Sequence, residues 1–165
     1  MTRTPFKLAA LAITCGLGLA QAQTTPLELK FASSAPPTSP WAKQIDRMAA
    51  SVAEESKGAV KITPFYGSQL GSENDAIAQI SRGRIDMGSF TANSVALQVP
   101  EIALLQLPFF FDSQQQRDCV LDNHVQKYTV EALAKKNLVF IAWGEVGSVH
   151  LPGKKPYLTP ADVKG

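Results

Sequence analysis

Strand-like and helix-like segments alternate along much of this chain, and that order restricts its fold more than any other feature. Apolar and polar side chains alternate in residues 27–31, as in a half-exposed strand, and residues 59–65 and 84–90 are further strand candidates. The two segments between these strands carry apolar side chains at helical spacing, with Ser39 and Ser72 as the expected N-caps. A β-α-β-α-β order of this kind predicts an α/β fold with a mainly parallel sheet flanked by helices.

The second half of the chain is predicted to be irregular at first and helical afterwards. Two prolines interrupt the apolar segment 100–112, so a packed and partly irregular crossover is expected there instead of one regular helix. The elements expected to follow are helices at 113–121 and 124–136, a buried strand at 138–143 and a short strand at 148–151.

The N-terminus has the pattern of a secretory signal peptide. Arg3 and Lys7 precede a short apolar stretch at residues 8–19, and the small residues Ala20 and Ala22 favour cleavage after Ala22. The stretch is too short for a comfortable membrane span, and no other segment is apolar enough for one. Residues 1–22 are therefore predicted to direct export and to be removed, and the mature chain is not expected to span a membrane.

The charges of the sequence argue against two classes of partner. The chain has 16 basic and 14 acidic residues, and cleavage after Ala22 would remove two basic residues and no acidic one. The resulting neutral chain offers no electrostatic attraction to nucleic acid or to an anionic membrane surface. Cys119 would be the one cysteine left, so stability is expected to come from packing and not from an internal disulfide.

Several sequence blocks follow the first strand, whose centre is Leu29-Lys30-Phe31, in a recognisable order. They are GSQLGSE at 67–73, RGRIDM at 82–87, LPFFF at 107–111 and LTPADVKG at 158–165. With these blocks the mature chain resembles the substrate-binding proteins of TRAP transporters, the DctP family of periplasmic receptors for organic acids.

The resemblance implies the first lobe of a two-lobed, periplasmic-binding-protein-like fold. Residues 23–145 would form this lobe, and residues 146–165 would form the crossover to a second lobe. It implies a receptor in the periplasm that binds a small organic acid, such as a C4-dicarboxylate, between its lobes and delivers it to the TRAP membrane permease. Strand ends and helix N-termini suit this role because their free N–H groups attract a carboxylate. No catalysis, metal or cofactor is expected.

Two departures from the family pattern concern the arginines that hold the substrate carboxylate. Arginine suits that role because its planar fork can pair with both carboxylate oxygens. In the family one such arginine follows the block that corresponds to 158–165, whereas this sequence ends at Gly165. Val149 occupies the place of another. The expectation is therefore an incomplete receptor that is impaired in ligand binding.

Candidate contacts to the ligand lie at the ends of the predicted strands and at the start of the second helix, where open α/β sheets bind their ligands. Several also have a structural explanation, because the two serines can satisfy loop backbone, Glu73 can complement a helix dipole and Phe90 can belong to the core. The predicted contacts are Ser33, Ser34, Glu73, Asn74, Phe90, Thr91, Asn93, Trp143 and Glu145.

Three other interpretations remain open at this point. Cys119, Asp122 and His124 lie close in sequence and could suggest a small secreted thiol enzyme or a metal site. Their spacing matches no zinc signature, and proximity in sequence does not supply the activating partner that a catalytic thiol needs. The chain could also be a non-functional remnant of a receptor gene, or a half-receptor that pairs with a separately encoded second lobe.

Overall fold

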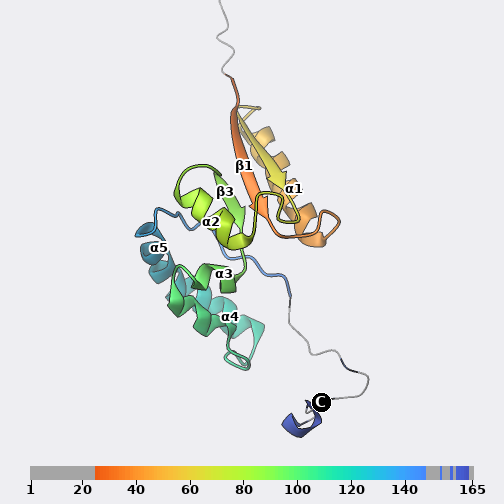
Figure 1. The fold of residues 1–165 in the computed structure, drawn as a ribbon, viewed down its shortest axis with the longest axis vertical. Coiled ribbons are helices and arrows are strands. Elements are labelled where there is room, and N and C mark those ends of the chain that lie inside the picture. The colour runs from red at the N-terminus through yellow and green to blue at the C-terminus, as the bar shows by residue number, and fades with distance from the viewer. Residues whose placement is uncertain (1–24, 148–152, 154–156, 158, 164–165) are drawn as a thin grey trace, which may run out of the picture.

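The computed structural model describes most of the chain that follows the predicted signal peptide (Figure 1). The described residues are 25–147, 153, 157 and 159–163. The predicted cleavage site after Ala22, the predicted strand at 148–151 and Val149 lie outside them. Within the described residues, no helix is both long and apolar enough to cross a membrane.

A parallel sheet organises the first half of the structure. Its strands are β1 (Leu27–Ser33), β2 (Val60–Phe65) and β3 (Met87–Ser89). They follow the spatial order β2-β1-β3, and Phe31 of β1 lies opposite Pro64 on one side and Met87 on the other. β1 is therefore the central strand, and the predicted parallel sheet is confirmed.

β3 is shorter than the predicted strand at 84–90 because a side chain replaces part of its ladder. If the ladder continued by one residue, Lys30 would pair with the backbone of Asp86. Instead, the N–H of Lys30 donates to Oδ2 of Asp86 at 2.7 Å. The side chain satisfies the edge of β1, so the backbone before Met87 is free to turn away.

Both predicted N-caps are confirmed. The helices are α1 (Pro40–Glu55) and α2 (Glu73–Ser81). Ser39 Oγ accepts a hydrogen bond from the N–H of Ala42 at 3.1 Å. Ser72 Oγ accepts one from the N–H of Asp75 at 3.2 Å, and the Asp75 carboxylate accepts one from the Ser72 N–H at 3.3 Å. The second pair is a capping box, which satisfies two backbone donors that the helix itself cannot.

Neighbouring residues of β1 point to opposite faces of the sheet, and each face is covered by its own helix (Figure 1). Phe31 packs against Ile45 of α1 in one buried cluster. Ala32 packs against Ala76 of α2 and against Ile85 in another. The two helices therefore enclose the central strand between two apolar clusters.

Beyond β3 the chain is helical and builds a second group of elements beside the sheet (Figure 1). They are α3 (Ala92–Ala96), the 3₁₀ helix η1 (Pro100–Gln106), α4 (Gln114–Val120), the π-helical turn η2 (Leu121–Val125) and α5 (Gln126–Ala134). Val99, Ile102 and Leu133 form a shared buried cluster. η1 confirms an irregular segment after Pro100, and η2 joins the two predicted helices. A short 3₁₀ turn, η3 (Pro160–Val163), lies near the C-terminus.

The prediction of a buried strand at 138–143 is wrong. In the described part of the chain this segment pairs with no strand. Val139 is 90% exposed and Ile141 is 72% exposed, whereas Leu138 and Phe140 pack against the cluster of Val99 and its neighbours. The apolar residues of this segment therefore pack on one side only. A strand also needs a neighbouring strand for its backbone hydrogen bonds, and apolar composition does not indicate whether one is present.

The expectation of a packed crossover over 100–112 is only partly met. Ile102 is almost fully buried, at 2% exposure. Leu107 and Phe110 are about half exposed, and Phe109 is fully exposed, with a backbone φ of +59°. The turn at Phe109 directs its ring away from the helices, so the end of the segment lies on the surface.

The core position of Ile45 leads to a prediction about stability. Ile45→Ala should lower the free energy of unfolding by about 2–5 kcal/mol, because it opens a cavity beneath Phe31. Ile141→Ala is the matched control, and with a largely exposed side chain it should change that free energy by less than about 0.5 kcal/mol. Urea denaturation followed by circular dichroism measures both. Equal losses in the two variants would contradict the assignment of the core.

Candidate functional site

A small hollow lies at the sheet edge where β1 and β3 end and α2 begins. It has room for about one water-sized group, about 10 Å³. Parallel strands end at the same edge of a sheet, which brings residues that are distant in sequence to this place. The hollow is lined by four predicted contacts, Ser33, Ser34, Glu73 and Phe90, and by Ser68, Leu70 and Gly71 among others.

The turn after β2 closes one side of the hollow. The N–H of Ser68 donates to the carbonyl of Ser33 at 3.1 Å, and the N–H of Gly67 donates to the carbonyl of Ala35 at 2.9 Å. Gly67 and Ser68 both have left-handed backbones, with φ of +58° and +61°. Glycine adopts this conformation readily, whereas serine adopts it at some cost. The hydrogen bonds to Ser33, the last residue of β1, and to Ala35 hold this turn in place.

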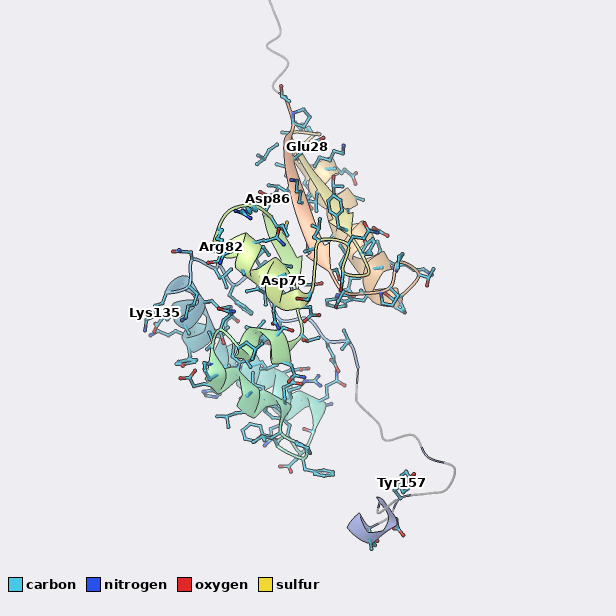
Figure 2. All side chains as sticks on the ribbon, in the orientation of Figure 1. Glu28, Asp75, Arg82, Asp86, Lys135 and Tyr157 are labelled. Carbon is cyan, nitrogen blue, oxygen red and sulfur yellow. The ribbon has the colours of Figure 1, made fainter. Side chains whose placement is uncertain are left out.

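Glu73 joins three separate segments of the chain at this edge. It belongs to the first turn of α2, which the labelled Asp75 marks in Figure 2. Its Oε1 accepts a hydrogen bond from Ser34 Oγ at 2.5 Å. Its Oε2 accepts bonds from the N–H of Thr91 at 2.9 Å and from Thr91 Oγ1 at 2.7 Å. The ends of β1 and β3 are thus tied to the start of α2 through one carboxylate.

The surroundings of Glu73 favour its ionised form. Burial raises the pKa of this carboxyl, but hydrogen bonds from Ser34, Ser94 and Thr91 outweigh it and hold the pKa below its ordinary value. The position of Glu73 in the first turn of α2 adds the favourable field of the helix N-terminus. Glu73 is therefore negatively charged at neutral pH.

Other predicted contacts lie elsewhere. Asn74 and Asn93 are exposed and do not line the hollow. Glu145 forms an ion pair with Arg117 at 2.8 Å and accepts a hydrogen bond from Gln114 at 3.1 Å. Both partners of its carboxylate belong to α4. These contacts belong to the packing of the segment that follows α5.

Trp143 is half-buried and also lies outside the lining of the hollow. Its ring lies 4.9 Å from that of Phe140, between ring centres. Its indole nitrogen is buried, and no hydrogen-bond partner for it is found among the described residues.

Sequence reasoning missed three residues near the hollow. Ser68 lines it, and Ser89 and Trp41 lie in a hydrogen-bonded chain that leads to Ser33. The signal for Ser68 was its place in a turn beside Gly67, where a strained backbone is typical of a functional site. No local signal links Trp41 to Ser89, because their contact depends on how α1 packs on the sheet.

Cys119, Asp122 and His124, which suggested a thiol or metal site, lie on α4 and η2. Cys119 is exposed, and its sulfur contacts the side-chain amide of Asn123 at 3.6 Å. The described residues contain no group of three or more histidine, cysteine, aspartate or glutamate side chains that could hold a metal ion.

The sheet, its flanking helices and the polar edge define the chain as one lobe of a periplasmic-binding-protein-like α/β fold. The model of the family described as bacterial extracellular solute-binding protein, family 7 (DctP) matches residues 31–165, and the chain belongs to this family. The family and the fold are those of solute-binding proteins in transport.

Individual relatives agree with this assignment. A solute-binding protein of Chromohalobacter salexigens is 33% identical over 131 residues, which cover 79% of this chain and 39% of that protein. The 2,3-diketo-L-gulonate-binding periplasmic protein of Escherichia coli is 33% identical over 113 residues, which cover 68% of this chain and 34% of that protein. The chain therefore spans little more than a third of the length of these relatives.

A solved structure supports the fold directly. The TRAP periplasmic solute-binding protein of Roseobacter denitrificans, with bound β-D-glucuronate, is similar to this chain with a TM-score of 0.74 and 29% identity. The similarity covers 84% of this chain and 46% of that one.

The lowered pKa of Glu73 leads to a prediction about pH. Because the folded-state pKa lies below the unfolded value, this group stabilises the fold above its ordinary pKa of about 4.5, and the contribution is lost as pH falls through the folded pKa. Glu73→Gln should cost about 1 kcal/mol at pH 7, after allowance for partial exposure. Its stability should also fall less steeply than that of the unmodified chain as the pH falls below about 4.5.

Urea denaturation between pH 3 and pH 7 measures this difference. Glu54→Gln, at an exposed position on α1, is the matched control and should follow the unmodified chain. The same acid slope in Glu73→Gln and the unmodified chain would contradict the electrostatic role of Glu73.

Proposed function

We propose that this chain supplies the first lobe of a TRAP-type periplasmic receptor whose ligand is a polyhydroxylated monocarboxylic acid, a sugar acid, in preference to a C4-dicarboxylate. The observation that carries the proposal is the ionised Glu73 in the lining of the hollow. A ligand that approaches this edge meets a negative charge surrounded by hydroxyl groups.

The charge of Glu73 separates the two ligand classes. A second carboxylate on the ligand would be repelled at this edge, and the repulsion would grow as closure of a cleft removed water. A sugar hydroxyl has no charge and can both donate to a carboxylate and accept from a serine. The lining supplies both kinds of group, since Ser33, Ser34 and Ser68 lie around Glu73.

The similar proteins support the same ligand class. The Escherichia coli relative is named for 2,3-diketo-L-gulonate, and the Roseobacter structure holds β-D-glucuronate. Both compounds are acids with several oxygen-bearing carbons, and neither is a C4-dicarboxylate. The broader expectation of an organic-acid receptor agrees with these relatives. Our proposal replaces the C4-dicarboxylate, which was the example ligand, with a sugar acid.

The membrane permease of a TRAP transporter is the proposed protein partner, and the periplasm is the proposed location. Family membership and the signal-peptide pattern of residues 1–22 support both.

Cleavage after Ala22 is tested by expressing the chain in a Gram-negative host and measuring the intact mass of the periplasmic product. The mass should correspond to a chain that begins at Gln23. Ala22→Leu, which removes the small residue before the expected cut, should leave a larger product. A periplasmic product that retains Met1 in the unmodified chain would contradict the prediction.

The ligand class is tested by titrating the chain with D-glucuronate, D-galacturonate and succinate, using calorimetry and the melting temperature. Either sugar acid should raise the melting temperature by mass action, and more than succinate does at equal concentration. Succinate binding as strong as that of both sugar acids would contradict the proposal, as would the absence of binding.

The same titration tests the expectation of impaired binding. A lobe that contacts one side of a small ligand buries much less of it than a closed cleft does, so the dissociation constant should be about 1 mM or weaker. Binding of any of these acids at micromolar strength would show that the expected impairment is wrong.

A further inference from the structure

A chain of hydrogen bonds runs from α1 through β3 to the hollow. The indole N–H of Trp41 donates to Ser89 Oγ at 3.2 Å. Ser89 Oγ lies 3.1 Å from Ser33 Oγ, and the N–H of Ala35 donates to Ser33 Oγ at 3.2 Å. Ser33 is only 4% exposed, yet its side chain lines the hollow. Trp41, Ser89 and Ser33 thus form one hydrogen-bonded group, the relay.

The relay contains one hydroxyl proton that has no hydrogen-bond acceptor within it. An indole N–H and a backbone N–H can only donate, so Trp41 fills one acceptor site on Ser89 and Ala35 fills one on Ser33. Ser89 Oγ donates to Ser33 Oγ, which uses the Ser89 proton. The Ser33 proton has no acceptor in the part of the chain that the structure describes. Of the two serines, Ser33 is the one that lines the hollow.

The packing around the ring of Trp41 fixes the direction of its indole N–H. One side packs with the cluster of Phe31, Ile45 and Ile62. On another side lies Gly144, where an added Cβ would come within 2.3 Å of the indole Cη2. The fit leaves no room for a side chain at Gly144, so the indole has little freedom to turn its N–H away from Ser89.

We propose that Trp41 and Ser89 are positioning residues that hold the Ser33 hydroxyl as a hydrogen-bond donor to one ligand oxygen in the hollow. The proposal rests on the sugar-acid function above and extends it to specificity. The donor on Ser33 and the negatively charged acceptor on Glu73 line the same water-sized hollow. A ligand hydroxyl can satisfy both, because it accepts and donates, whereas a carboxylate can only accept.

The relay is tested in the full chain by a double-mutant cycle on D-glucuronate binding. Trp41→Phe keeps a ring against the core and removes the N–H, and it should weaken binding about 3- to 10-fold, the range expected for one hydrogen bond. Ser33→Ala should weaken binding by at least as much. In the Ser33→Ala background, Trp41→Phe should change the dissociation constant by less than about twofold, because its effect passes through Ser33.

Two further variants separate positioning from general damage. Ser89→Ala breaks the same relay without touching the ring, and it should reproduce the effect of Trp41→Phe on the dissociation constant. Tyr66→Phe is the matched control, because Tyr66 packs with the same cluster as Trp41 but its hydroxyl bonds to Asp46. It should leave the dissociation constant unchanged even if the melting temperature falls.

The outcomes distinguish this proposal from the function on which it rests. If the chain binds D-glucuronate and Trp41→Phe has no effect, or the same effect with and without Ser33, the positioning role is overturned and the function stands. If the chain binds no acid, the function is overturned.

The ¹⁵N-indole resonance of Trp41 gives a readout that is independent of the ligand. Ser89→Ala and Ser33→Ala should both shift it, because each changes the hydrogen bonding along the relay. A resonance that neither variant moves would overturn the relay itself.

Discussion

The pairing of β1 with a strand on each side is the constraint on which the rest of the structure depends. A central strand must bury both of its faces, so the adjacent residues Phe31 and Ala32 each require a covering helix. That requirement places α1 and α2 on opposite faces of the sheet. The same parallel pairing brings the end of β1 beside the end of β3, where Ser33 meets Ser89. The strand pairing of β1 therefore determines both the core and the position of the candidate site.

Glu73 connects the segments that follow β1 and β3 at the edge of this sheet. Without it, the segments after β1 and β3 would be separate loop ends, and the hydroxyls of Ser34 and Thr91 would lack their shared acceptor. The hydrogen bonds that hold the carboxylate also keep it charged. The group that ties the segments together therefore also places a negative charge in the lining of the hollow.

Local features and the parallel sheet were predicted well, whereas several individual contacts between distant segments were not. The caps at Ser39 and Ser72 involve hydrogen bonds to residues three positions away, so the sequence around them was sufficient. The segment 138–143 has the composition of a buried strand but lacks a strand partner in the described structure, and composition carries no information about that partner. Glu145, a predicted ligand contact, pairs with Arg117, and this ion pair could not be foreseen from its position after an apolar segment.

By itself, the sequence determined the order of strands and helices, their N-caps, the export pattern and the membership of a solute-binding family. These properties follow from the periodicity of apolar residues, from short-range hydrogen bonds and from the order of the sequence motifs. The sequence also placed Ser33 and Glu73 at the same sheet edge, but only the tertiary structure decided the hydrogen bonds there. Trp41 reaches Ser33 through Ser89 because strand register and helix packing bring distant segments together, and no pattern of neighbouring residues specifies that contact.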